Sequence, residues 1–287
     1  MAKILKGSEA AKAINERTIK QVKELKAAGV TPTLAILRVG ERPDDISYER
    51  GARKRCEAVG VAVRSVVLPA DIAQEDFDRE LTALNEDPQG HGILLFRPLP
   101  QQLDSERARR MLAPQKDVDG CTDGSLAGVF TNTPQGFCPC TAQAAMEILD
   151  HYQIECKGKN AVVIGRSLVV GRPAAMLLMH KNATPTICHT KTELMQEIVR
   201  KADLVIVCAG KTESIGSEYF RAGQTVIDVG IGWNEEKGKL CGDVDFDVVE
   251  PLVEAITPVP GGVGAVTTSV LVSHVAEAAL RSLKEQV

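Results

Sequence analysis

Apolar residues follow two alternating patterns along most of this chain. Short runs of Val, Ile and Leu, typical of buried strands, are separated by stretches in which apolar residues recur at helical spacing. The pattern predicts strands at residues 31–40, 61–68, 92–96, 160–165, 183–189, 202–210 and 225–232. It predicts helices at residues 8–29, 46–60, 73–87 and 142–154. Because strands and helices alternate, we expect an α/β fold with mainly parallel sheets.

A segment rich in Gly, Pro, Asp and Thr interrupts this alternation between residues 97 and 141. A loop of that length is usually functional or marks a domain junction, and we place the junction near residue 140. The last predicted helix, residues 268–287, carries an apolar stripe that must pack on another element. The stripe does not say which of the two domains it covers.

Composition narrows the class of protein. With 287 residues, of which 44% are hydrophobic and 25% charged, the chain suits a soluble protein of two domains. Its net charge of −4 argues against nucleic acid as the main partner. The N-terminus has no apolar signal segment, and no apolar run approaches the roughly 18 residues of a membrane span. We therefore expect a cytoplasmic protein that does not bind a membrane.

The eight cysteines are scattered without CxxC pairs, which favours reduced thiols over a disulfide scaffold. Cys138 and Cys140 form the only close pair, and they lack the second half of a metal site. His189 adjoins Cys188 at the end of a predicted strand, but neither has a clear partner. We therefore predict structural roles for these residues and no bound metal.

The loop from Gly165 to Gly171 joins a predicted strand to a helix that has Pro173 in its first turn. Free backbone N–H groups and the positive end of the helix dipole favour a phosphate there. The glycines are five residues apart and do not match G-x-G-x-x-G, so the loop by itself fits a structural turn equally well.

The next predicted strand ends at His189 without the Asp or Glu that usually meets the ribose hydroxyls of NAD. Arg166 and Lys191 are placed where they can meet a 2′-phosphate instead, although both also suit a solvated surface. This pattern favours NADP over NAD.

Two other stretches combine turn residues with candidate chemistry. Residues 116–120, KDVDG, do not match a calcium loop because Cys121 follows and no bidentate Glu stands at the twelfth position. The motif suits an Asx turn, or a site in which Asp119 accepts paired N–H donors from a flat, amidine-like ring. The glycines of residues 257–269 allow a close backbone approach to a ligand, and they suit a plain tight turn as well.

Six motifs then occur in a fixed order: RPLP (97–100), KDVDG (116–120), PCT (139–141), GRSLVVGRP (165–173), GDVDF (242–246) and TPVPGGVG (257–264). Together they resemble the bifunctional methylenetetrahydrofolate dehydrogenase/methenyltetrahydrofolate cyclohydrolase family, over nearly the whole chain. The resemblance implies an α/β folate domain, residues 1–140 plus 270–287, and a Rossmann-like NAD(P)-binding domain, residues 141–269. It also implies a cleft between the domains and a homodimer.

The same resemblance implies the chemistry. A hydride passes from the methylene carbon of 5,10-methylenetetrahydrofolate to the nicotinamide, and bifunctional members then add water to the methenyl cation. The family pattern assigns catalytic roles to Tyr48, which stacks near the folate, and to Asp119, which holds the pterin. Further folate contacts fall at Pro98, Leu99, Gly261 and Gly262. Cofactor contacts fall at Gly165, Arg166, Ser167, Thr190 and Ile231.

Two positions depart from the family pattern. The lysine expected four residues after Tyr48, which the family uses for hydration, is Ala52, and the glutamine expected near it is Phe96. Nearby basic residues do not replace that lysine: Lys54 points about 240° around the helix from Tyr48. Arg55 lies roughly 10 Å along the axis and keeps its proton, and Arg97 contributes charge at most.

We therefore expect an NADP-linked methylenetetrahydrofolate dehydrogenase whose cyclohydrolase activity is lost or weak. One alternative is a fully bifunctional enzyme that uses another base or a water chain. The other is a non-catalytic protein that binds folate or nucleotide, against which the intact loops at residues 165–167 and 261–264 count.

Overall fold

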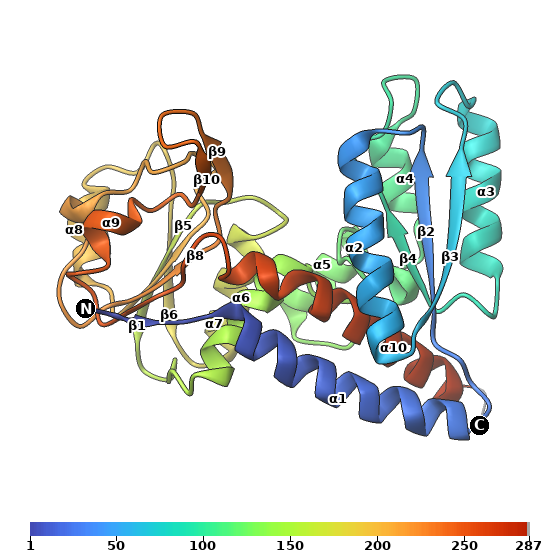
Figure 1. Ribbon diagram of the computed structural model, residues 1–287, viewed down its shortest axis with the longest axis horizontal. Coiled ribbons are helices and arrows are strands. Elements are labelled where there is room, and N and C mark those ends of the chain that lie inside the picture. Colours follow the sequence, from blue (N-terminus) through green and yellow to red (C-terminus); the bar gives the residue numbers. More distant parts are fainter. Residues whose placement is uncertain (286–287) are drawn as a thin grey trace. The chain divides into compact units, whose positions relative to one another are not determined.

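The computed structural model describes residues 1–285 (Figure 1), so the last two residues of the predicted closing helix lie outside it. The described chain forms two compact units. We call them the three-stranded unit, made of residues 14–140 and 268–285, and the six-stranded unit, made of residues 1–13 and 141–267. Each has its own parallel sheet, which confirms the predicted α/β class.

Residues 1–13 fall in the six-stranded unit, whereas the resemblance grouped them with residues 14–140. The reason is a strand that the sequence pattern did not reveal. β1 (Lys3–Ile4) pairs in parallel with β11 (Ala255–Ile256) and so becomes the edge of the larger sheet. Two residues are too few to show any periodicity, and only the distant partner makes them a strand.

The sheet of the three-stranded unit has the order β3-β2-β4, and both pairings are parallel. Its strands are β2 (Thr33–Val39), β3 (Ala62–Leu68) and β4 (Gly92–Leu95). The crossover helices are α2 (Pro43–Val59) and α3 (Gln74–Glu86). Alternate residues of β2 and β4, such as Leu37 and Ile93, form one buried cluster with Phe77 and Leu81 of α3. Strands buried in a parallel sheet are typically apolar throughout, as β4 is, whereas the less buried β3 carries Arg64 and Ser65.

Two short helices occupy the segment that the sequence indicated as loops, and that expectation was wrong. They are α4 (Ser105–Met111) and α5 (Asp123–Thr131). Each is fixed by a side-chain cap: Asp104 accepts the N–H of Arg107, and Thr122 accepts the N–H of Ser125. Helices of two turns carry too few apolar positions to show a stripe, so periodicity misses them.

The long terminal helices are α1 (Gly7–Ala27) and α10 (Thr267–Glu285). From residue 268 onward, α10 belongs to the three-stranded unit, which resolves the question that its apolar stripe left open. Among the described residues one segment, Val263–Lys284, has the length and apolar composition to cross a membrane, contrary to the expectation from the sequence. Its most apolar window is 61% buried inside the protein, as in the core helix of a globular domain.

The sheet of the six-stranded unit has the order β1-β11-β8-β7-β5-β6. Besides β1 and β11, its strands are β5 (Asn160–Ile164), β6 (Thr184–Cys188), β7 (Leu204–Val207) and β8 (Thr225–Asp228). The helices are α6 (Cys140–His151), α7 (Gly171–His180), α8 (Met195–Lys201) and α9 (Phe246–Val249). A hairpin of β9 (Gly232–Asn234) and β10 (Lys239–Cys241) follows β8 and forms a separate small sheet.

All six strands of this sheet run parallel, so their carboxyl ends lie at one edge. The loops that begin at Gly165, His189, Cys208 and Val229 leave the sheet at that edge. In open α/β sheets, ligands bind outside the carboxyl ends of the strands. The expected cofactor contacts therefore belong to one edge of one sheet.

Candidate functional site

A cavity of about 350 Å³ lies where β4 ends beside the first turns of α2. Its lining includes four residues that the sequence singled out, namely Tyr48, Phe96, Arg97 and Asp119. Tyr48 comes from α2, and Phe96 and Arg97 directly follow β4. The three-stranded unit thus brings Tyr48 and Asp119, two of the expected folate contacts, to the same cavity as Phe96, which stands where the family pattern has a glutamine.

The ring of Phe96 packs edge-on against the ring of Tyr48, with 5.7 Å between the ring centroids and an interplanar angle of 72°. Phe96 is 7% exposed, and Ala52, one turn of α2 beyond Tyr48, is 1% exposed. Desolvation raises the pKa of the Tyr48 hydroxyl well above its usual value, and the Asp119 carboxylate raises it further. Tyr48 is therefore a neutral phenol at physiological pH and not a base.

Arg97 forms an ion pair with Asp119 across the cavity, with 3.2 Å between Nη2 and Oδ2. The two side chains are 32% and 29% exposed, so a ligand can reach both. Burial raises the pKa of Asp119, and the guanidinium of Arg97 opposes that rise by favouring the charged carboxylate. The sequence indicated only that Arg97 contributes charge, because the pairing joins residues 22 positions apart.

The two aspartates of the KDVDG motif have separate roles. Asp117 is fully buried, and its carboxylate accepts the N–H groups of Gly120, Cys121 and Thr122 and the hydroxyl of Ser125. It forms the Asx-type turn that the sequence suggested. The Asx-turn interpretation thus applies to Asp117, whereas Asp119 lines the cavity and its role as an acceptor for a flat ring stays a prediction.

The other expected folate contacts do not line this cavity. Leu99 is buried in the apolar cluster on β2 and β4, where it packs in the core. Pro98 follows a cis peptide bond, and its carbonyl accepts a hydrogen bond from Arg42, which does line the cavity. Gly261 and Gly262 belong to the six-stranded unit, and the carbonyl of Gly261 accepts the N–H of Gly7.

The expected phosphate loop leaves β5 at Gly165, which has φ +138°. A Cβ at Gly165 would lie 2.3 Å from the carbonyl oxygen of Cys208, and one at Gly171 would lie 2.2 Å from the carbonyl oxygen of Gly165. Ser167 Oγ accepts the N–H of Val170 at 3.1 Å, which orders the approach to α7. Only glycine permits this close packing of loop and helix start, the geometry that a dinucleotide phosphate needs.

Arg166, Ser167, Thr190 and Lys191 are all exposed in the loops after β5 and β6, and Ile231 is exposed after β8. His189 is part of a turn, since its Nδ1 accepts the N–H of Lys191 at 3.1 Å. The turn after β6 therefore presents Lys191 and no carboxylate at the position where NAD enzymes usually hold the ribose.

None of the eight cysteines forms a disulfide bond. Within residues 1–285, one group of side chains has the spacing of metal ligands, namely Glu213, Asp245 and Asp247. The ammonium of Lys237 lies among these carboxylates, 2.5 Å from Glu213 and 3.2 Å from Asp247. It supplies the positive charge that a cation would otherwise bring.

Comparison with known proteins places these features in a family. Residues 5–119 match the catalytic domain of the tetrahydrofolate dehydrogenase/cyclohydrolase family, and residues 139–283 match its NAD(P)-binding domain. The chain belongs to the tetrahydrofolate dehydrogenase/cyclohydrolase family. The resemblance inferred from the motifs is thereby confirmed, and the protein is a methylenetetrahydrofolate dehydrogenase with an NAD(P)-binding domain.

Several relatives match over their whole length. The chain is 48% identical to the bifunctional protein FolD of Carboxydothermus hydrogenoformans over 279 residues, which is 97% of each protein. It superposes on the bifunctional FolD of Campylobacter jejuni with a TM-score of 0.94 and 35% identity, covering 100% of both chains. The methylenetetrahydrofolate dehydrogenase-cyclohydrolase (FolD) of Trypanosoma brucei, whose structure was determined with NADP and an inhibitor, gives a TM-score of 0.90 and 36% identity, covering 99% of both chains.

Two features, one in each unit, were not apparent from the sequence. One is the Arg97–Asp119 ion pair, and the other is a buried aspartate, Asp228, which accepts three backbone N–H groups at the end of β8. The only sequence signal for Asp228 is its place at the end of an apolar strand in a nucleotide-binding fold.

Proposed function

We propose that this protein is an NADP-linked 5,10-methylenetetrahydrofolate dehydrogenase whose cyclohydrolase activity is absent or weak. The observation that carries the proposal is the edge-on contact between Phe96 and Tyr48, with Ala52 one turn along the same helix. Apolar side chains thus stand at both positions where the family pattern has a lysine and a glutamine.

The dehydrogenase step requires mainly that two rings be held in register. In our proposal Tyr48 stacks near the folate, and Asp119 accepts N–H donors from the pterin in charge-assisted hydrogen bonds. Arg97 supports this role, because its guanidinium favours the ionised state of Asp119 against the effect of burial. The hydride can leave the methylene carbon without any proton transfer to or from Tyr48 or Asp119.

Hydration of the methenyl cation requires a group that positions water and accepts a proton. Ala52 and Phe96 have no such group, and the Tyr48 phenol keeps its proton because its pKa is raised. Arg97 does not release a proton at any physiological pH. Lys54 and Arg55 do not line the cavity, as their positions around and along the helix predict.

The bound cofactor supplies the acceptor for the hydride. The loop at Gly165 fits a dinucleotide phosphate, because a Cβ at Gly165 or Gly171 would fill the approach to the start of α7. The absence of an acid after β6, with Arg166 and Lys191 exposed nearby, supports NADP over NAD. The NADP complex of the Trypanosoma brucei relative also supports this choice.

The test uses purified full-length protein. We expect methylenetetrahydrofolate and NADP to give reduced cofactor and methenyltetrahydrofolate in equal amounts, with a lower rate for NAD at equal concentration. Methenyltetrahydrofolate added alone should disappear no faster than in buffer. Catalysed loss of that compound would establish a fully bifunctional enzyme, and binding of folate and cofactor without turnover would establish the non-catalytic alternative.

The expected homodimer and cytoplasmic location stay predictions. Sedimentation of the purified protein tests the first, and fractionation of cells that express it tests the second.

A further inference from the structure

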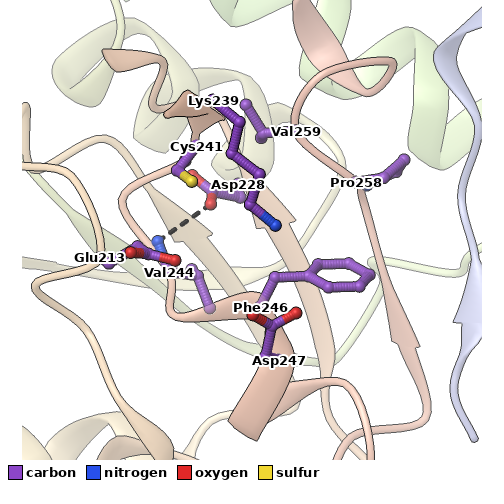
Figure 2. A pocket seen from close by; sticks show the side chains of 10 residues that line it. Glu213, Asp228, Lys239, Cys241, Val244, Phe246, Asp247, Pro258 and Val259 are labelled. Atoms are coloured by element: carbon purple, nitrogen blue, oxygen red, sulfur yellow. Dashed lines mark hydrogen bonds between the residues drawn. The ribbon is translucent and has the colours of Figure 1, made fainter. Parts of the chain in front are cut away.

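Asp228 ends β8 and is 3% exposed, yet its carboxylate has a complete set of partners. Oδ1 accepts the N–H groups of Gly230 at 2.9 Å and Asp243 at 3.1 Å, and Oδ2 accepts the N–H of Val244 at 2.9 Å. Figure 2 shows the last of these bonds at the base of a pocket of about 260 Å³. One side chain thus ties the loop after β8 to the segment that precedes α9.

The connections extend to two further segments. The backbone N–H of Asp228 donates to Thr257 Oγ at 2.7 Å, and the carboxylate of Asp243 accepts the N–H of Gly210 at 2.8 Å. The loops after β7 and β8 and the segments around residues 243 and 257 are therefore joined through two aspartates. Two of these segments lie beside expected ligand contacts, since Gly230 precedes Ile231 and Thr257 lies four residues before Gly261.

The carboxylate fits its surroundings closely. A Cβ at Gly242 would lie 1.9 Å from Oδ2 of Asp228, and a Cβ at Gly230 would lie 2.2 Å from the carboxyl carbon of Asp243. The absence of a side chain at each glycine thus allows the backbone to approach these two carboxylates closely.

We propose that Asp228 is a positioning residue that holds the loops at the carboxyl edge of the six-stranded sheet in the arrangement that binds the nicotinamide cofactor. The proposal rests on the proposed function, because it takes Ile231 and Gly261 as ligand contacts. The carboxylate of Asp228 is 3% exposed and is occupied by backbone N–H donors. It acts through the backbone of Gly230 and of residues 243–244.

The hydrogen bonds of this network are strongest when Asp228 is ionised. Burial raises the pKa of Asp228 to about 7, the three N–H donors oppose the rise, and the carboxylate of Asp243 adds to it. The other titratable groups that face it are Cys208 and, around the same pocket, Glu213, Lys239, Cys241 and Asp247. A protonated Asp228 has an O–H donor in place of one acceptor lone pair and no negative charge, so its hydrogen bonds to these N–H groups would be weaker.

The test replaces Asp228 with Asn, which has the same shape but presents one oxygen and one NH₂ group. A backbone N–H then faces a donor, and we expect the KM for NADP to rise about tenfold or more, with a smaller change in kcat. The affinity of the wild-type enzyme for the cofactor should fall as pH drops below about 7. The affinity of the variant should not change with pH in this range. Asp245→Asn, in the same segment but outside the network, is the matched control.

A second measurement reports binding without turnover. Trp233 is the only tryptophan of the chain and lies two residues after Ile231, so its fluorescence should change when reduced cofactor binds. The affinity of Asp228→Asn for NADPH should fall by the same factor as its KM rises. A purely structural role would lower the active fraction and the thermal midpoint but leave the KM and the pH profile unchanged.

An unchanged KM and pH profile in Asp228→Asn would overturn the inference, and so would an equal effect of Asp245→Asn. Failure of the proposed function looks different. In that case the wild-type protein itself would show no turnover of methylenetetrahydrofolate with either cofactor. Trp233 fluorescence would still report whether Asp228 controls nucleotide binding.

Discussion

The ring of Phe96 lies edge-on to the ring of Tyr48, 5.7 Å away, at the position where the family pattern places a glutamine. Aromatic pairs in this geometry stabilise a fold by about 0.5–1.5 kcal/mol beyond the area they bury. The substitution has therefore not left a gap in the site. It has replaced a polar group beside the tyrosine with a packing contact, and the first prediction reverses that exchange.

Replacing Ala52 with Lys and Phe96 with Gln together should raise cyclohydrolase activity above that of the wild type. Ala52 is 1% exposed, and burial lowers the pKa of an amine, which brings the new lysine closer to exchanging a proton at neutral pH. The rate of loss of methenyltetrahydrofolate is the measurement. Gly51→Lys is the matched control, because it places a lysine on the same helix where a side chain meets open space. No gain in the double variant would contradict our account of this helix.

Replacing Arg97 with Leu should weaken folate binding, with a rise of about tenfold in the KM for methylenetetrahydrofolate and little change in the KM for NADP. Without the guanidinium, burial acts unopposed and the pKa of Asp119 rises further. The loss should therefore be greatest at low pH, where more of Asp119 is protonated. Steady-state kinetics from pH 6 to pH 8 measure this, and a uniform effect on both substrates would count against it.

Replacing Gly165 with Ala should reduce both stability and affinity for the cofactor. The new Cβ would lie 2.3 Å from the carbonyl oxygen of Cys208, so the loop must move to accommodate it. Gly158→Ala is the control, since Gly158 also has a positive φ but a Cβ there meets nothing within 4 Å. Both variants should lose about 1 kcal/mol from backbone strain, and only Gly165→Ala should bind NADP more weakly. Equal affinities, measured by titration, would show that this loop does not contact the phosphates.

The pH dependence of stability should include a contribution from His274 of α10. Burial lowers its pKa to about 4, and its Nδ1 lies 2.8 Å from the carbonyl oxygen of Val118. The unfolded chain binds this proton below about 6.5 and the folded protein only below about 4, so stability falls as pH drops through that window. The full effect is about 3 kcal/mol. In His274→Gln, denaturant unfolding at pH 7 and pH 4.5 should differ less than in the wild type.

The sequence by itself determined the α/β class, most strands and long helices, and the family. Those features depend on the spacing of apolar residues, on the positions of glycines and on the order of the motifs, all of which are visible in the sequence. It also revealed the missing lysine, since helical spacing places Ala52 next to Tyr48 without any knowledge of the fold. The sequence did not predict the short helices α4 and α5, because helices of two turns carry no apolar stripe.

Tertiary structure decided which polar groups meet. Pairing over about 250 residues placed β1 in the six-stranded sheet, and a contact across the cavity joined Arg97 to Asp119. The same kind of contact made Asp228 the centre of a buried network, whereas Asp117 forms a local turn that the sequence suggested. The sequence shows only that each of these residues is an aspartate. Its burial and the donors around its carboxylate distinguish them, and both are set by residues that only the folded chain brings together.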